Sequence, residues 1–177
     1  MPPDNQSRFE EAILPHLDAA YNLARWLMRN DNDAEDAVQD ACLRALRFIG
    51  GFRGGDARVW LLAIVRNTCF TKLKQDRAHR PAASFDEELH GSDAESASPG
   101  PEAALLRSAT GAALTKALED LPAEFREIIV MRELDNLSYK EIAGVTGVPI
   151  GTVMSRLARA RKRLRDSLSR DPSGELA

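Results

Sequence analysis

The stretch from Leu137 to Arg165, LSYKEIAGVTGVPIGTVMSRLARARKRLR, constrains the fold of this chain more than any other part. Ser138 followed three residues later by Glu141 has the spacing of a capping box, which predicts the start of a short helix. Gly147 and Pro149 end that helix, because glycine permits a left-handed residue and proline lacks a backbone donor. A second helix is expected directly after this turn, and the pair predicts a helix-turn-helix.

The second helix, expected from Ile150 or Gly151 to about Arg165, combines an apolar stripe with a basic remainder, and no acidic residue interrupts it. The stripe recurs with the period of a helix buried on one side and consists of Val153, Leu157, Ala160 and Leu164. In helix-turn-helix proteins the N-terminal residues of this helix reach base edges, and arginines further along clamp phosphates or pair with guanine. A solvated amphipathic helix is the alternative for a basic run alone. The capped first helix, the turn and the acid-free second helix together favour DNA binding.

The charge of the whole chain argues against a general nucleic-acid coat. Its formal net charge is −3, with basic residues concentrated toward the C-terminus and acids concentrated in residues 31–40 and 86–95. This asymmetry predicts two partners of opposite electrostatic character. The sequence has no basic-then-apolar leader and no long apolar span, so a soluble, cytoplasmic protein without membrane insertion is expected.

Cysteine and histidine usage predicts no metal site. The two cysteines, Cys42 and Cys69, lie in apolar helical stretches and are expected to be buried free thiols, with a redox switch as the alternative. The histidines His16, His79 and His90 are scattered, and none has another histidine or a cysteine at ligand spacing. We therefore expect no metal and no cofactor.

The N-terminal half has the periodicity of a helical bundle. A turn at residues 30–33 precedes the second of its helices, for which Asn32 or Asp33 is the expected N-cap. The segment GGFRGG at 50–55 breaks that helix, and Asp56 then caps the third. The helices are expected at residues 9–28, with Pro15 beginning a new helix or kinking one, at 33–48 and at 57–77.

Residues 78–102 differ from the rest in being rich in Pro, Gly, Ser and acids, so a flexible linker is expected. Its length of about 25 residues could extend to roughly 80 Å, enough for two flanking domains to touch DNA about two turns apart. Two further helices, at 103–119 and 123–133, precede the helix-turn-helix, and strand-like alternation is absent from the sequence. The predicted fold is all-α, with two small helical bundles: a domain at 1–77, the linker at 78–102, a domain at 103–170 and a disordered tail at 171–177.

Segments in both halves of the sequence resemble a known family. The segment at 121–164, LPAEFREIIVMRELDNLSYKEIAGVTGVPIGTVMSRLARARKRL, resembles the domain of bacterial sigma factors that reads the −35 promoter element. The segments at 33–46, DAEDAVQDACLRAL, and at 57–75, ARVWLLAIVRNTCFTKLKQ, resemble the sigma domain that binds core RNA polymerase and opens the −10 element. Two such domains with a short linker resemble the extracytoplasmic-function (ECF) group. The resemblance implies a non-enzymatic initiation factor whose partners are core polymerase, promoter DNA and an anti-sigma factor.

The resemblance also implies three groups of contact residues. On the second helix, the residues that dock on the clamp coiled coil of the large polymerase subunit are Asp33, Glu35, Asp36, Gln39, Asp40 and Arg44. In the glycine-rich loop and on the third helix, the residues at the −10 strand are Phe52, Arg53, Asp56, Arg58, Trp60, Arg66, Asn67, Thr71, Lys72 and Lys74. In the helix-turn-helix, the residues at the −35 element are Thr152, Ser155, Arg156 and Arg159, with Lys140, Lys162 and Arg163 on phosphates.

The chemistry of these residues agrees with the implied roles. An acidic, polar helix face suits a basic and polar partner, although an ordinary solvated face has the same composition. Holding a melted strand needs a basic track and pockets or aromatic faces for unstacked bases. The assignment of Trp60 to the −10 strand has the weakest support in the group, because a bulky residue in an apolar run is typical of a hydrophobic core. Aromatic residues make up only 6% of the chain, and the cluster of exposed aromatics with which primary sigma factors melt DNA is not evident. This departure suits the ECF group, and the resemblance then implies limited melting power and a strict promoter requirement.

Two other functions are compatible with parts of the sequence. A stand-alone helix-turn-helix regulator with an N-terminal sensor or dimer domain would bind a palindromic operator tightly without polymerase. A small all-α enzyme would need a catalytic dyad, a phosphate loop or a metal cluster, and the sequence shows none of these patterns. For an initiation factor we expect weak promoter binding by the free protein, because its net negative charge opposes binding.

Overall fold

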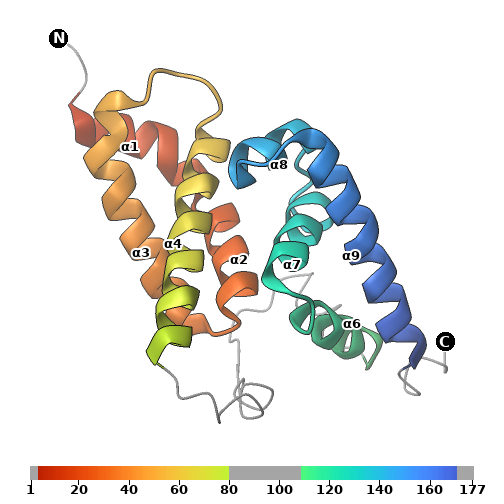
Figure 1. Ribbon diagram of the computed structural model, residues 1–177. Coiled ribbons are helices and arrows are strands. Elements are labelled where there is room, and N and C mark those ends of the chain that lie inside the picture. The colour runs from red at the N-terminus through yellow and green to blue at the C-terminus, as the bar shows by residue number, and fades with distance from the viewer. Residues whose placement is uncertain (1–3, 80–108, 171–177) are drawn as a thin grey trace.

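The computed structural model describes residues 4–79 and 109–170, and within these two ranges every regular element is a helix (Figure 1). The all-α prediction of two helical bundles, the second with a helix-turn-helix, is therefore confirmed. The predicted tail, and the predicted linker from residue 80 onward, lie outside the described residues. The N-terminal bundle consists of α1 (Asn5–Ile13), η1 (Leu14–His16), α2 (Leu17–Met28), α3 (Asp31–Phe48), η2 (Ile49–Gly51) and α4 (Ala57–His79). The C-terminal bundle consists of α6 (Ala109–Glu119), α7 (Ala123–Ile129), η5 (Val130–Leu134), α8 (Tyr139–Thr146) and α9 (Ile150–Arg170).

Local signals set most helix ends of the N-terminal bundle. Pro15 lies in the single 3-10 turn that separates α1 from α2, as its fixed φ and missing donor predict. The expected N-cap of α3 was wrong: the helix begins at Asp31, and the side chain of Asn30 accepts the hydrogen bond from the backbone N–H of Asp33. The cap lies earlier because Asn30 is extended, which leaves Asp31 and Asp33 in the first turn, where carboxylates favour the helix dipole.

Helix α4 is the centre of the N-terminal bundle and packs against both α2 and α3. Asp56 caps it as predicted, since its Oδ1 accepts the backbone N–H of Val59 at 3.1 Å. Cys42 lies on α3 and Cys69 on α4, two helices that pack against each other, and both are free thiols. Cys69 is buried and Cys42 half-buried, and this burial raises the pKa of both thiols, that of Cys69 to about 12. A raised pKa disfavours the thiolate, which is the nucleophilic form of cysteine.

The C-terminal bundle contains the predicted capping box in full. The Oγ of Ser138 accepts the backbone N–H of Glu141, and the carboxylate of Glu141 accepts the backbone N–H of Ser138. Gly147 ends α8 with φ +74°, a left-handed conformation that glycine adopts without strain. Helix α9 then begins at Ile150 and buries its predicted stripe against α7, α8 and α6, with Val153, Leu157 and Ala160 fully enclosed and Leu164 packed beside them.

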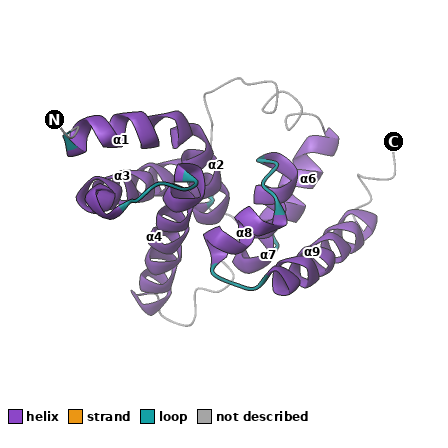
Figure 2. Cartoon of the chain, turned by 90° about the horizontal axis from the view of Figure 1, so that it is seen from above, coloured by secondary structure: helices purple, strands orange, loops and turns teal. Residues whose placement is uncertain are grey.

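The two bundles do not stand apart but pack against each other. Helix α8 lies on α4, and α7 lies on α2, so that α7 and α8 form the boundary in both views of the ribbon (Figures 1 and 2). Buried apolar residues of both bundles form one continuous core that runs from Ile13 in α1 to Ala160 in α9. Helix α9 lies on the outside of this closed arrangement, and its outer face is exposed to solvent (Figure 1).

Candidate DNA and polymerase interfaces

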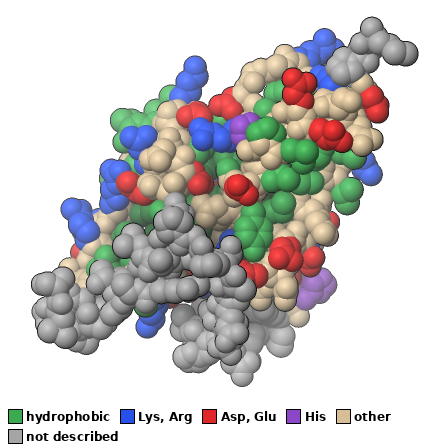
Figure 3. Space-filling view, turned by 180° about the vertical axis from the view of Figure 1, so that it is seen from behind, with side chains coloured by type: hydrophobic (Ala, Val, Ile, Leu, Met, Phe, Trp, Pro, Cys, Tyr) green, Lys and Arg blue, Asp and Glu red, His purple; other side chains and the backbone are tan. Residues whose placement is uncertain are grey.

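The exposed face of α9 carries most of the residues predicted at the −35 element. Ser155, Arg159, Lys162 and Arg163 are exposed there, and Lys140 is exposed on α8. Lys and Arg side chains gather along the edge of the molecule that α9 forms (Figure 3). The guanidinium of Arg163 stacks over the ring of Phe125 at 4.8 Å, which orients it at the surface. The exposed basic side chains of this face suit binding to the phosphates of DNA.

Two of the predicted −35 residues are less available than the sequence suggested. Thr152 and Arg156 are half-buried, and the hydroxyl of Ser155 donates a hydrogen bond to the carbonyl of Thr152 at 3.1 Å. Arg156 lies close enough to the buried Glu127 of α7 for its charge to oppose the rise in that carboxyl's pKa. Arg156 therefore interacts in part with the protein itself, whereas Arg159 is exposed.

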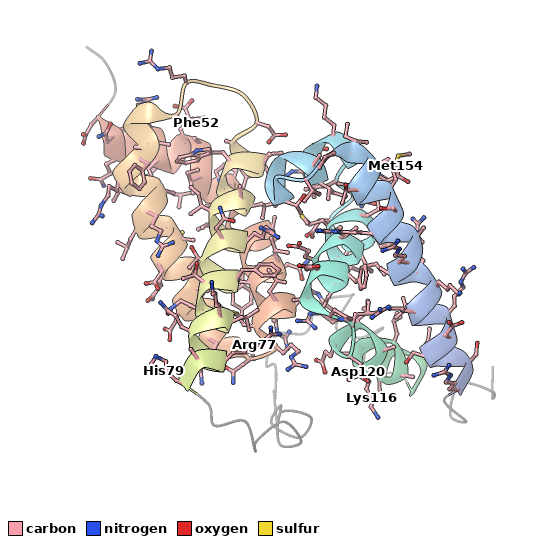
Figure 4. All side chains as sticks on the ribbon, in the orientation of Figure 1. Phe52, Arg77, His79, Lys116, Asp120 and Met154 are labelled. Carbon is pink, nitrogen blue, oxygen red and sulfur yellow. The ribbon has the colours of Figure 1, made fainter. Side chains whose placement is uncertain are left out.

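The loop predicted to capture a base is held at both ends. The ring of Phe52 lies 5.0 Å from that of Trp60 at a tilt of 36°, and Arg8 donates a hydrogen bond to the Phe52 carbonyl at 2.8 Å. Phe52 and Trp60 are both half-buried against the core, so Trp60 supports Phe52 instead of standing free. Phe52 lies where the loop begins (Figure 4). After it, Arg53 is exposed, and the loop turns through Gly54 and Gly55 at positive φ.

The predicted −10 residues on α4 form a row along its exposed side. Asn67, Thr71 and Lys74 are exposed, and the hydroxyl of Thr71 donates to the Asn67 carbonyl at 2.8 Å. Lys72 instead forms an ion pair with Asp40 of α3 at 2.9 Å, and the hydrogen bond to Asp40 raises the pKa of this lysine. One predicted DNA contact is thus tied to one predicted polymerase contact.

The predicted polymerase-binding face of α3 is exposed and acidic along most of its length. Asp33, Glu35, Asp36, Gln39 and Arg44 are exposed, and Asp40 is half-buried. Two large apolar side chains outside the predicted group, Leu43 and Phe48, lie on the same helix and are 67% and 59% exposed. Their signal in the sequence was weak, because an apolar residue in an amphipathic helix is usually assigned to the core.

The boundary between the bundles occupies two of the predicted −10 residues, Arg58 and Arg66. Nη2 of Arg58 lies 2.6 Å from Oε2 of Glu141, the residue that also closes the capping box. Arg66 binds Glu127 through two hydrogen bonds, Nε to Oε2 at 2.8 Å and Nη2 to Oε1 at 3.2 Å. Both pairs join α4 to the C-terminal bundle, so carboxylates bind two arginines for which the resemblance implies contacts with the −10 strand.

Glu127 is fully buried and depends on its partner. Burial raises the pKa of this carboxyl, and the hydrogen bonds and charge of Arg66 oppose the rise. Because both charges would regain water if the bundles separated, such a pair adds little net affinity, while an unmatched partner would be costly. The pair therefore fixes the register of α4 against α7 more than it strengthens the contact.

Arg126 links helix ends of the two bundles. Its guanidinium donates to the carbonyls of Glu119 and Leu121 at 2.9 and 2.7 Å, and to that of Leu27 at the end of α2 at 3.3 Å. Burial lowers the pKa of Arg126 to about 10. Asn22 adds a hydrogen bond to Asp135 at 2.9 Å. The sequence could have flagged Glu127 and Arg126 only as charges inside the apolar run EFREIIVM.

Within residues 4–79 and 109–170, none of the helices combines the length and hydropathy needed to span a membrane. The same residues contain no group of three or more side chains placed to hold a metal ion.

Comparison with known families separates the chain into the same two parts. Residues 12–79 match the family Sigma-70 region 2, and residues 111–164 match the family Sigma-70, region 4. Two solved structures share the fold over both bundles. The sigma factor RpoE in complex with the anti-sigma factor NepR from Bartonella quintana aligns with a TM-score of 0.67 at 28% identity, over 92% of this chain and 98% of that one. CnrH in complex with the cytosolic domain of CnrY aligns with a TM-score of 0.63 at 25% identity, over 94% and 90%.

Curated relatives agree with this assignment. The ECF RNA polymerase sigma factor SigE of Mycolicibacterium smegmatis is 36% identical over 165 residues, which cover 93% of this chain but only 63% of that protein, less than two thirds of its length. The RNA polymerase sigma-H factor of Pseudomonas aeruginosa is 32% identical over 166 residues, with 90% and 86% covered. The ECF RNA polymerase sigma factor SigM of Mycobacterium tuberculosis is 37% identical over 158 residues, with 88% and 74% covered. With both sigma regions present in one chain, in the order and fold of these relatives, the protein belongs to the ECF group of sigma-70 family RNA polymerase sigma factors.

Proposed function

We propose that the protein is a dissociable transcription initiation factor that binds core RNA polymerase and directs it to promoters with specific −35 and −10 elements. The observation that carries the proposal is the pairing of two surfaces in one chain. The C-terminal bundle presents a helix-turn-helix whose second helix is basic and without acids from 150 to 165, and the N-terminal bundle presents the acidic helix α3. The acidic face of α3 suits a basic and polar protein partner, whereas the basic face of α9 suits DNA.

In this proposal each surface has one task. The exposed acids of α3 dock on the polymerase clamp, the loop around Phe52 and the exposed side of α4 hold the opened −10 strand, and Arg159 with its neighbours on α9 binds the −35 element. Each surface is small, so each domain binds weakly alone. Tethering to the same polymerase raises the effective concentration of one domain at the promoter once the other is bound.

The closed arrangement has a consequence for this mechanism. Arg58 and Arg66 cannot contact a DNA strand while Glu141 and Glu127 hold them. The two bundles must therefore separate before the whole −10 track is available. This supports weak promoter binding by the free protein, for a reason additional to its net charge of −3.

We also propose control by an anti-sigma factor and a place of action in the cytoplasm, where polymerase and chromosome lie. RpoE, whose fold this chain shares over both bundles, was solved in complex with the anti-sigma factor NepR, and CnrH was solved in complex with the cytosolic domain of CnrY. A partner that binds both bundles would act by holding the closed arrangement. The protein itself has no catalytic role in this proposal, since the polymerase carries out the chemistry.

Run-off transcription with purified core polymerase and a genomic promoter library tests the proposal. Adding the protein should produce discrete transcripts that core polymerase alone does not make, and the enriched promoters should share two elements at fixed spacing. A stand-alone helix-turn-helix regulator would instead protect a palindromic site without polymerase and would leave the transcripts unchanged. That result would replace the initiation-factor proposal.

A further inference from the structure

The N-terminal turns of α9 expose apolar side chains that the basic surface does not explain. In the described part of the C-terminal bundle, residues 109–170, the large hydrophobic side chains that are exposed are Ile150 and Met154, at 45% and 52%. They are four residues apart and so lie on one side of the helix. Met154 points away from the body of the protein (Figure 4). Such exposure in the described bundle is confined to the part of the helix that meets base edges in helix-turn-helix proteins.

The polar neighbours of Met154 are partly committed to the protein itself. The hydroxyl of Ser155 donates to the carbonyl of Thr152, and Thr152 is half-buried. Arg156 is half-buried near Glu127. Met154 is therefore the longest side chain in these turns that is both exposed and free of a partner interaction within the described chain, and its unbranched thioether can adapt to an irregular surface.

We propose that Met154, supported by Ile150, contacts the C5-methyl group of a thymine in the −35 element and so makes α9 selective for that base. This inference rests on the proposed function of α9. Thymine is the base that presents an apolar group in the major groove, and apolar side chains recognise it there. Charge favours DNA as the occupant, because Arg159 and Lys162 are exposed on the same helix and no acid occurs between residues 150 and 165.

The experiment removes the methyl group without changing the hydrogen bonds of the base. Holoenzyme is assembled from purified core polymerase and the full-length protein, and its preferred promoter is taken from the library selection. Each thymine of the −35 element, on either strand, is then replaced singly by deoxyuridine, and open-complex formation is measured at subsaturating holoenzyme. With the wild-type protein one or two positions should lose activity by about three- to fourfold, the contribution of one buried methyl group.

Met154→Ala should remove this discrimination, giving equal activity on thymine and uracil at those positions, and Met154→Leu should restore part of it. Leu14→Ala, which shortens a comparably exposed apolar side chain in the N-terminal bundle, should discriminate as the wild type does. Three results would each overturn the inference alone. Discrimination could persist in Met154→Ala, the wild type could use thymine and uracil equally, or the selected element could contain no thymine. Absence of promoter-specific transcripts on thymine templates would overturn the proposed function and the inference together.

Discussion

A substitution at Gly144 should force the two bundles apart without damaging either. A Cβ atom at Gly144 of α8 would lie 2.9 Å from Cγ1 of Val59 on α4, closer than real side-chain carbons approach. Val59 is β-branched and held in a strongly preferred rotamer, so its methyl group cannot easily turn away. Gly144→Ala therefore strains the contact between α4 and α8, and the strain is relieved when the bundles separate.

The size of the effect follows from where the strain acts. One extra methyl group in a well-packed contact costs about 1–3 kcal/mol, and this cost falls on the closed arrangement only. Alanine in place of glycine favours the helical state of α8 by about 0.5–1 kcal/mol in both arrangements, so it cancels in the comparison between them. The equilibrium should shift toward the open form by a factor of about 5 to 150.

Two measurements on the purified full-length protein check this shift. Small-angle X-ray scattering should show a larger radius of gyration for Gly144→Ala than for the wild type. Fluorescence anisotropy with a single-stranded −10 oligonucleotide should show tighter binding, because Arg58 and Arg66 are released and the competent fraction rises. Gly151→Ala is the matched control: it makes the same chemical change within α9, but its Cβ would meet no atom within 4 Å.

A strained α4–α8 contact is contradicted if Gly144→Ala scatters and binds the oligonucleotide as the wild type does while keeping its helical content. It is also contradicted if Gly151→Ala shows an equal increase in size and affinity, because the effect would then not arise at the α4–α8 contact.

Three further substitutions test the remaining surfaces. Arg159→Ala should lower promoter-specific transcription about tenfold, which lies within the 1–3 kcal/mol of one base contact. Co-elution with core polymerase should be unchanged, and its loss would contradict the assignment of Arg159 to the −35 element. Asp36→Arg should abolish most co-elution with core polymerase, whereas Asp18→Arg, the same charge change on α2, should not, and equal losses would point to net charge alone. Hydrogen bonds from the backbone N–H of Ser138 and from Arg58 lower the pKa of Glu141 from 4.5 to about 2. The stability that this carboxylate contributes is therefore complete above pH 4.5 and is lost as the pH falls toward 2. The wild-type Tm should fall more steeply in this range than that of Glu141→Gln. Parallel Tm profiles would refute the contribution of the Glu141 carboxylate to stability.

Helix positions and ends were predictable to the extent that their causes are local. The 3.6-residue period of α9, the capping box at Ser138, the Asp56 cap and the left-handed Gly147 all depend on residues within one or two turns. The N-cap of α3 was placed too late because several capping residues follow one another from Asn30, and only the backbone conformation selects among them. The last turn of the predicted 123–133 helix widens into the π-helical η5, which its periodicity did not reveal.

The sequence by itself determined the two helical bundles, the helix-turn-helix and the charge character of α3 and α9, because hydrophobic period, caps and charge runs act over a few residues. Tertiary structure alone decided which of the candidate contact residues are free. Arg66 meets Glu127 across 61 residues, Arg58 meets Glu141 across 83, and Asn22 meets Asp135 across 113. These partners are chosen by how two apolar surfaces fit together, and that fit depends on the shape of both bundles at once, which no local pattern in either segment records.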